Sequence, residues 1–322
     1  MVPPNTLRRV FGLLLGGFLV NPAAGEVRIQ TYTYKQVGDL EIKADVHRAD
    51  DETLRPVVVW IHGGALIMGS RSGIDARVKK MFLEAGYALV SIDYRLAPET
   101  KLPAILEDVE DACRWIREKG PELFRIDASR MAVLGSSAGG YLTLTAGHRL
   151  EPRPTVLAAL WGYGDLIGDW YSRPSLHPRH YRSKMTEEQA RRQVSGPAIA
   201  NAKDRQGDGG AFYQFCRQRG IWPQEVSGWN PHTEAQRYYP YMPIKNVTGQ
   251  YPPTLLIHGA EDTDVPYEQS VLMADQFRKF SVDHTFITIP GGEHGLAGGD
   301  PKEIDQAYQQ VFQFVHQRMA GR

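Results

Sequence analysis

Apolar residues follow two patterns along the chain, short continuous runs and helical stripes, which alternate through most of its length. Continuous apolar runs at residues 57–61, 131–134 and 254–257 are typical of strands buried on both faces. Between such runs, apolar residues recur at helical spacing, as they do between residues 105 and 116. This alternation indicates right-handed βαβ units and a mostly parallel central sheet with helices on both faces. We therefore predict an α/β fold.

A different pattern precedes the first continuous apolar run. Residues 27–35 and 40–47 are rich in Thr, Tyr, Val and Ile, and they flank the dipeptide Gly38-Asp39. Two β-prone segments joined by such a turn are typical of an antiparallel hairpin. We expect this hairpin to precede the parallel strands.

The alternation is interrupted once. Between residues 161 and 251 there is no clear buried strand, and polar stretches and aromatic residues take its place. The strand pattern resumes at residue 252, and the chain ends with an apolar helical stripe between residues 304 and 315. We therefore predict one α/β core formed by residues 26–160 and 252–322. Residues 161–251 would form an inserted cap or lid over the C-terminal ends of the strands.

Four of the tryptophans lie in this predicted insertion, and they allow two interpretations. Trp161, Trp170, Trp222 and Trp229 present aromatic faces that could stack on the aryl or sugar part of a substrate. The same rings could instead form a small core of the insertion itself. The sequence leaves both interpretations open.

Length and charge narrow the classes of partner. With 322 residues, the chain suits one domain with a sizeable insertion. Lys plus Arg and Asp plus Glu are equal at 37 each, so the formal net charge is zero. A protein with no net charge has no overall electrostatic attraction to nucleic acid or to a charged membrane. We expect no nucleic-acid partner, and the sequence leaves the oligomeric state open.

The first 25 residues have the organisation of a secretory signal peptide. Arg8 and Arg9 precede an apolar run at residues 10–20, and small residues follow up to Gly25. The run is shorter than the roughly 20 residues that cross a bilayer. We predict cleavage after Gly25, or less favourably after Ala24, and export to the periplasm or the medium without membrane association. An uncleaved membrane anchor is the alternative.

The two cysteines, Cys113 and Cys216, permit at most one internal disulfide, and the sequence does not show whether they pair. Their spacing is not that of a zinc or dithiol site. His177 and His180 have no acidic neighbour at ligand spacing. We therefore predict no metal site.

The segment Gly135-Ser136-Ser137-Ala138-Gly139 fits the pattern Gly-x-Ser-x-Gly. It directly follows a predicted buried strand and precedes a predicted helix. A sharp turn in that position holds its serine in a strained conformation, lifts the hydroxyl clear of the sheet and aims the N-terminus of the helix at the reaction centre. Ser137 is therefore the candidate nucleophile.

A serine hydroxyl needs a base within hydrogen-bond reach, and in this topology an acid and then a histidine follow the serine along the chain. His294 lies in a glycine-flanked loop after the last predicted strand, and we identify it as the base. Asp262 follows the strand at residues 254–257 and is the favoured acid. Asp264 and Glu261 in the same loop remain rivals that the sequence does not exclude.

Acyl transfer also needs hydrogen-bond donors aimed at the oxyanion that develops in the transition state. The segment His62-Gly63-Gly64-Ala65 stands at the end of the first buried strand. Its glycines allow backbone amides to approach a substrate closely. We predict an oxyanion hole built around Gly63, Gly64 and Ala65 and completed by the amide of Ala138.

These motifs together resemble the hormone-sensitive-lipase-like and acetyl-esterase-like branch of the α/β hydrolases. The matching stretches are residues 62–64, 93–99, 102–104 and 135–140, together with the loops of Asp262 and His294. The resemblance covers both flanks of the chain, residues 28–160 and 252–318. It implies a Ser–His–Asp triad, no cofactor and hydrolysis of short-chain carboxylic esters.

The chain departs from that branch at several places. Ala65 stands where the branch often has a third glycine, and residues 258–266 look more like feruloyl-esterase-like and prolyl-oligopeptidase-like relatives. The resemblance does not extend to residues 161–251.

We therefore predict a serine carboxylesterase that forms an acyl-enzyme intermediate and acts on short-chain or small aryl-linked or sugar-linked esters. A peptidase or an acyltransferase with the same triad is the alternative among enzymes. A non-catalytic ligand receptor of the same fold is the alternative from another class. The presence of all the triad residues argues against a receptor.

Overall fold

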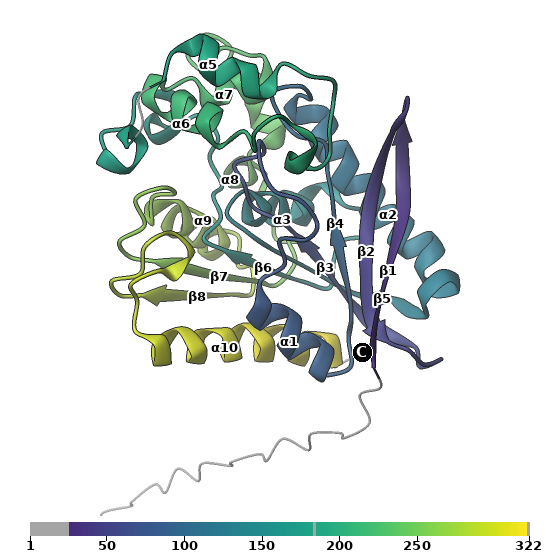
Figure 1. Cartoon of the computed structure of the whole chain (residues 1–322). Coiled ribbons are helices and arrows are strands. Elements are labelled where there is room, and N and C mark those ends of the chain that lie inside the picture. Colours follow the sequence, from purple (N-terminus) through teal and green to yellow (C-terminus); the bar gives the residue numbers. More distant parts are fainter. Residues whose placement is uncertain (1–25, 183–184, 321–322) are drawn as a thin grey trace, which may run out of the picture.

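A single eight-stranded sheet forms the centre of the computed structural model, which describes residues 26–182 and 185–320 (Figure 1). The strands are β1 (Val27–Val37), β2 (Leu40–Ala49), β3 (Arg55–Ile61), β4 (Ala88–Ile92), β5 (Ile126–Ser136), β6 (Val156–Leu160), β7 (Thr254–Gly259) and β8 (His284–Ile289). Their order in the sheet is β1-β2-β4-β3-β5-β6-β7-β8. Strands β3 to β8 pair in parallel, whereas β1 pairs antiparallel with β2 and β2 antiparallel with β4. The prediction of a mostly parallel sheet is confirmed.

Helices cover both faces of the sheet, as predicted. Helices α2 (Leu102–Phe124), α3 (Ala138–Arg149) and α9 (Glu268–Lys279) pack on one face, and α1 (Ala76–Glu84) and α10 (Pro301–Ala320) pack on the other (Figure 1).

Strand β3 shows why the buried runs are apolar at every position. Val57, Val59 and Ile61 join the core on the α2, α3 and α9 side, whereas Val58 and Trp60 join the core on the α1 and α10 side. Since successive side chains of a strand point to opposite faces, a strand covered by helices on both faces needs no polar positions.

The predicted hairpin is present as β1 and β2. Its turn contains Gly38, whose φ of 58° lies in the left-handed region that glycine adopts without steric cost. The hairpin extends the sheet at the β4 edge, because β2 pairs with β4.

Between β6 and β7 the structure places short helices and turns and, among the described residues, no strand. We call residues 161–251 the inserted segment. Its α-helices are α4 (Asp169–Ser172), α5 (Glu187–Arg191), α6 (Gly210–Arg219), α7 (Trp222–Ser227) and α8 (Pro243–Asn246). Helices α5, α6 and α7 lie on the far side of the sheet from α10 (Figure 1).

The apolar core of the inserted segment is continuous with the core of the α/β domain. Phe212, Phe215 and Trp222 belong to the same buried cluster as residues of β3, α2 and α3. Burial of large apolar side chains is the main favourable term in folding. The inserted segment is therefore packed onto the sheet domain and does not form a separate core.

Two sequence predictions concern the termini and the cysteines. The predicted signal peptide, residues 1–25, lies outside the described residues. Within the described part of the chain, no helix combines the length and apolar character needed to cross a membrane. Cys113 lies on α2 and Cys216 on α6, and both are buried free thiols, so they do not pair with each other.

The start of α3 touches the end of β3 so closely that only glycine fits at position 139. A Cβ at Gly139 would lie 2.0 Å from the carbonyl oxygen of Ile61. We predict that Gly139→Ala lowers the free energy of unfolding by about 1–3 kcal/mol, because the backbone must shift to accept the methyl group. The measurement is urea denaturation followed by circular dichroism. Gly196→Ala is the control, since a Cβ there meets nothing within 4 Å. Equal midpoints for the two variants would contradict this account.

Candidate active site

Ser137 occupies the sharp turn between β5 and α3. Its φ of 55° and ψ of −119° lie outside the regions that non-glycine residues favour, a conformation that costs about 1–3 kcal/mol and persists only where the surroundings hold it. The amide of Ser137 donates to the carbonyl of Leu160 at 2.9 Å, and its own carbonyl accepts the amide of Tyr141 at 3.0 Å. The neighbouring strand and the first turn of α3 therefore fix the backbone that presents the hydroxyl.

His294 and Asp262 come from the loops that follow β8 and β7. A Cβ at Gly259 would lie 2.1 Å from the carbonyl oxygen of Gly292, so the two loops touch through glycine backbone. This contact brings the two functional side chains together. The distance from Nδ1 of His294 to Oδ2 of Asp262 is 2.7 Å, and the distance from Nε2 of His294 to Oγ of Ser137 is 3.1 Å. The three side chains thus have the connectivity of a Ser–His–Asp triad.

The structure distinguishes the three candidate acids. Asp262 is the residue that contacts Nδ1 of His294, and its other oxygen accepts the amides of Asp264 and Val265, both at 2.9 Å. Asp264 lies on the opposite side of the imidazole, with Oδ2 3.9 Å from Nε2. Glu261 is exposed to solvent. Only Asp262 is placed to orient the imidazole through Nδ1.

A second histidine supports this carboxylate and was not singled out from the sequence. His258, at the end of β7, is fully buried, and its Nε2 lies 3.3 Å from Oδ2 of Asp262. The same nitrogen lies 3.0 Å from the carbonyl of Val265, and Nδ1 lies 2.7 Å from the hydroxyl of Ser270. The sequence shows only that a histidine precedes the acid by four residues. The orientation of the His258 ring depends on its contact with Ser270 of α9, which is distant in the sequence.

The electrostatics of the site favour an ionised acid and a basic imidazole. Burial alone would raise the pKa of Asp262, but hydrogen bonds from His258 and His294 lower that pKa well below its usual range. Burial alone would lower the pKa of His294. The hydrogen bond to Asp262 and the negative charge of Asp264 outweigh burial and raise that pKa above its ordinary value.

The predicted oxyanion segment lies beside the nucleophile. A Cβ at Gly63 would lie 3.2 Å from the Cβ of Ser137. Gly64 and Ala65 have φ values of 110° and 55°, and for alanine such a left-handed conformation costs about 1–2 kcal/mol. Among the described residues, the amides of Gly64 and Ala65 donate to no acceptor. Ala138 is the first residue of α3, where the amide has no partner within the helix. These amides are the ones that the sequence assigned to the oxyanion hole.

A pocket of about 480 Å³ opens beside His294. Its lining residues come from the inserted segment and from the His294 loop; they are His177, Arg179, Arg182, Gln214, Glu293, His294 and Ala297. Arg179 connects its two walls, because Nη1 donates to Glu293 at 2.8 Å and to Thr263 at 3.0 Å. The lining of the pocket therefore carries charges of both signs.

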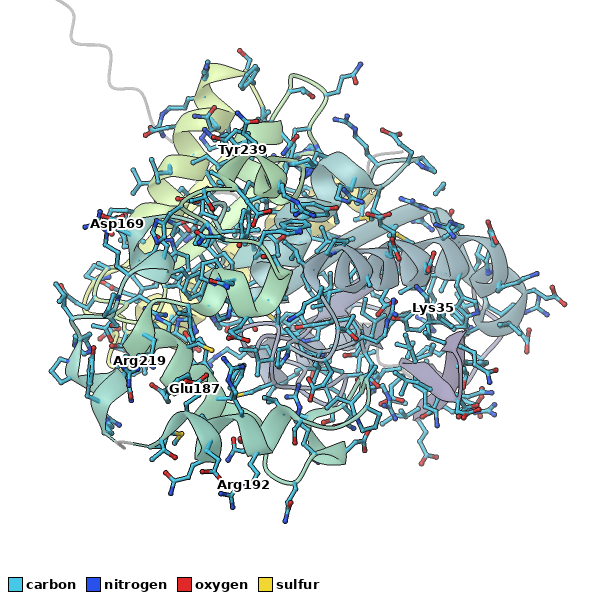
Figure 2. The ribbon with its side chains drawn as sticks, turned by 90° about the horizontal axis from the view of Figure 1, so that it is seen from above. Lys35, Asp169, Glu187, Arg192, Arg219 and Tyr239 are labelled. Atoms are coloured by element: carbon cyan, nitrogen blue, oxygen red, sulfur yellow. The ribbon has the colours of Figure 1, made fainter. Side chains whose placement is uncertain are left out.

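The view from above shows how the inserted segment is distributed (Figure 2). Asp169 and Arg219 of this segment lie on the opposite side of the molecule from Lys35 of β1 (Figure 2). The pocket beside His294 is thus bordered by the inserted segment, and no residue of the hairpin lines it.

The tryptophans of the inserted segment differ in their surroundings, and a role in stacking on a substrate stays a prediction. Trp222 is 1% exposed and stacks on buried Tyr171, so it belongs to the core. Trp170 instead lines a second hollow of about 700 Å³, which shares His177 with the pocket beside His294. The ring of Trp161 lies edge-on to that of His294, with centroids 6.5 Å apart.

Acidic side chains, histidines and cysteines do not gather into a metal-binding group anywhere in residues 26–182 and 185–320.

Two family models match separate parts of the chain. The BD-FAE family matches residues 45–153, which include Ser137 and the oxyanion segment, and the prolyl oligopeptidase family matches residues 212–322, which include Asp262 and His294. The two matches together carry all of the candidate catalytic residues.

Curated relatives are similar over most of this chain but are themselves longer. The non-reducing polyketide synthase ausA of Aspergillus calidoustus is 27% identical over 91% of this chain and 14% of its own length. Esterase LipC of Mycobacterium tuberculosis is 29% identical over 85% of this chain and 63% of LipC. The chain thus spans less than two thirds of the length of these relatives.

Solved structures share the fold. An alpha/beta hydrolase superfamily protein from Enterococcus faecalis superposes with a TM-score of 0.68 at 20% identity, covering 90% of this chain and 99% of that one. A hyperthermophilic esterase from the archaeon Pyrobaculum calidifontis superposes with a TM-score of 0.63 at 25% identity, covering 89% of this chain and 82% of that one. Sequence and structure therefore agree: the chain has the α/β-hydrolase fold and is similar in sequence to esterases such as LipC.

Proposed function

We propose that this protein is a serine carboxylesterase that hydrolyses short-chain or small aryl-linked or sugar-linked esters through an acyl-enzyme. The observation that carries the proposal is the position of His294, whose imidazole lies 3.1 Å from the Ser137 hydroxyl and 2.7 Å from the Asp262 carboxylate. The similarity to LipC and to the Pyrobaculum protein, both described as esterases, supports ester bonds as the target.

Acylation begins when Oγ of Ser137 attacks the carbonyl carbon of the ester. Nε2 of His294 takes the hydroxyl proton, and the resulting imidazolium is stabilised by Asp262 through Nδ1. The tetrahedral oxyanion accepts hydrogen bonds from the amides of Gly64, Ala65 and Ala138. When the intermediate collapses, His294 gives its proton to the departing alcohol oxygen, and the acyl group remains on Ser137.

Deacylation repeats these steps with water. His294 removes a proton from a water molecule as the water oxygen attacks the acyl carbon, and the same amides hold the second oxyanion. Collapse releases the carboxylic acid and returns the proton to Oγ of Ser137. The free triad is restored.

A peptidase is the second candidate, because the model that matches residues 212–322 belongs to the prolyl oligopeptidase family. The two functions differ in the leaving group, which is an alcohol in esters and an amine in peptides. Parallel assays on p-nitrophenyl esters and on p-nitroanilides of the same acyl group separate them.

The proposal is tested by removing the nucleophile. We predict that Ser137→Ala lowers kcat/KM for p-nitrophenyl acetate at least roughly a thousandfold and abolishes labelling by a fluorophosphonate probe. Ser136→Ala is the matched control, since it removes the hydroxyl of the preceding residue and should keep both properties. Equal rates for wild type and Ser137→Ala would exclude Ser137 as the nucleophile.

The assignment of the acid gives a second prediction. Asp262→Asn should lower kcat by roughly 10³–10⁴-fold, because an amide at Nδ1 no longer holds the imidazole in the correct tautomer. Asp264→Asn should cost far less, since that side chain does not contact Nδ1. Steady-state kinetics on p-nitrophenyl acetate compare the two variants. A larger loss in Asp264→Asn would reverse the assignment.

The pH dependence of kcat/KM follows from the state of His294. Nε2 accepts a proton only when the imidazole is neutral, so activity is lost as the pH falls through the pKa of His294. That pKa is raised above 6.5, because Asp262 and Asp264 stabilise the imidazolium against the opposing effect of burial. The acid limb of the pH profile should therefore have its midpoint above pH 6.5. Asp264→Asn should move this midpoint to lower pH, and an upward shift would contradict the electrostatic account.

A further inference from the structure

The backbone of the oxyanion segment is fixed partly by hydrogen bonds within the segment and partly by hydrogen bonds from other parts of the chain. Gly64, Ala65 and Leu66 follow one another with φ values of 110°, 55° and 61°, all in the left-handed region. Within the segment, the amides of Ile67 and Met68 donate to the carbonyl of Gly64 at 2.9 and 2.7 Å. Because the C=O and N–H of a trans peptide point in opposite directions, these bonds aim the amide of Ala65 away from them. The next peptide, between Ala65 and Leu66, has a carbonyl that accepts no hydrogen bond from within the segment.

Partners outside the segment hold the carbonyls that follow. The indole Nε1 of Trp222, in α7 of the inserted segment, donates to the carbonyl of Ala65 at 3.0 Å. The amide of Ala97, in the α/β domain, donates to the carbonyl of Leu66 at 2.8 Å, and the guanidinium of Arg205 donates to the carbonyl of Ile67. The bond from Trp222 is the one that fixes the peptide plane directly after the amide of Ala65.

The Trp222 ring is itself immobilised by stacking. The centroids of the Trp222 and Tyr171 rings are 4.0 Å apart, and the two planes form an angle of 18°. The ring of Tyr163 lies edge-on to that of Trp222, with centroids 6.2 Å apart. Tyr163 in turn stacks on Tyr141 at 5.1 Å. Tyr141 belongs to α3, the helix that begins directly after Ser137. A continuous set of aromatic rings therefore connects the helix of the nucleophile to the indole that holds the oxyanion segment.

We propose that Trp222 is a positioning residue for the oxyanion hole: by holding the peptide between Ala65 and Leu66, the inserted segment keeps the preceding turn, and with it the amide of Ala65, in its direction. The proposal rests on the proposed esterase function. The indole N–H donates to the Ala65 carbonyl and not to Ser137, so its effect passes through that carbonyl. Loss of this bond weakens hydrogen bonds that form fully only with the tetrahedral oxyanion, and it should leave binding of the planar ester almost unchanged.

The test is Trp222→Phe, which removes the N–H and keeps an aromatic ring in the stack. Removal of an oxyanion donor costs about 10²–10³ in kcat, so misdirection of one should cost roughly tenfold to a hundredfold. We expect this loss in kcat, with KM within roughly twofold of wild type. The affinity for an aryl trifluoromethyl ketone, which forms a tetrahedral adduct with the active-site serine, should fall by the same factor.

Two controls separate positioning from a general loss of folding. Trp229→Phe removes another indole N–H from the inserted segment and should change neither kcat nor the affinity for the ketone. Benzothienylalanine at position 222 keeps the shape of tryptophan and replaces the N–H by sulfur, so it should reproduce the loss of kcat in a folded protein.

The outcomes are distinct. Parallel losses of kcat and ketone affinity in both position-222 variants support the proposal. Wild-type kcat in the benzothienylalanine variant overturns it, whether or not Trp222→Phe folds, and so does a loss confined to KM. Absence of ester hydrolysis in the wild-type protein, together with an unlabelled Ser137, would instead be a failure of the proposed function.

Discussion

The contact between Gly259 and Gly292 determines whether the imidazole of His294 can meet the carboxylate of Asp262. A Cβ at Gly259 would lie 2.1 Å from the carbonyl oxygen of Gly292, so any larger residue would separate the loops. The 2.7 Å hydrogen bond between the two side chains depends on that proximity. It depends equally on the parallel sheet, because parallel strands bring the loops after β7 and β8 to the same edge.

The inserted segment supplies charges that complete the environment of the catalytic loops. Asp264, two residues after the acid, accepts a hydrogen bond from Tyr213 at 2.7 Å and one from Arg217 at 3.1 Å. Beside the oxyanion segment, where Arg205 donates to the carbonyl of Ile67, the same arginine forms an ion pair with Glu99, and both side chains are 3% exposed. A buried charge is tolerated only when a partner compensates the lost hydration. Each of these carboxylates belongs to the α/β domain, and each partner belongs to the inserted segment.

The fold and the order of the candidate triad could be predicted because their signals are local. Ser137 lies between a buried run and a helix, and His294 lies in a loop with glycines on both sides. The sequence favoured Asp262 as the acid but could not exclude Asp264, because the choice depends on which carboxylate accepts the loop amides. The roles of Trp222 and Arg205 were also missed. Trp222 contacts a carbonyl that lies 157 positions earlier in the chain, and no periodic pattern records such a contact.

The pairing of Glu99 with Arg205 has a consequence for engineering this scaffold. Exchange of residues 161–251 for the corresponding segment of another protein with this fold would remove the guanidinium and leave Glu99 in place. An uncompensated buried carboxylate of this kind typically costs about 3–5 kcal/mol, a large share of the stability of an ordinary domain. A viable graft must therefore carry its own cation to this position, or be combined with a neutral side chain at residue 99.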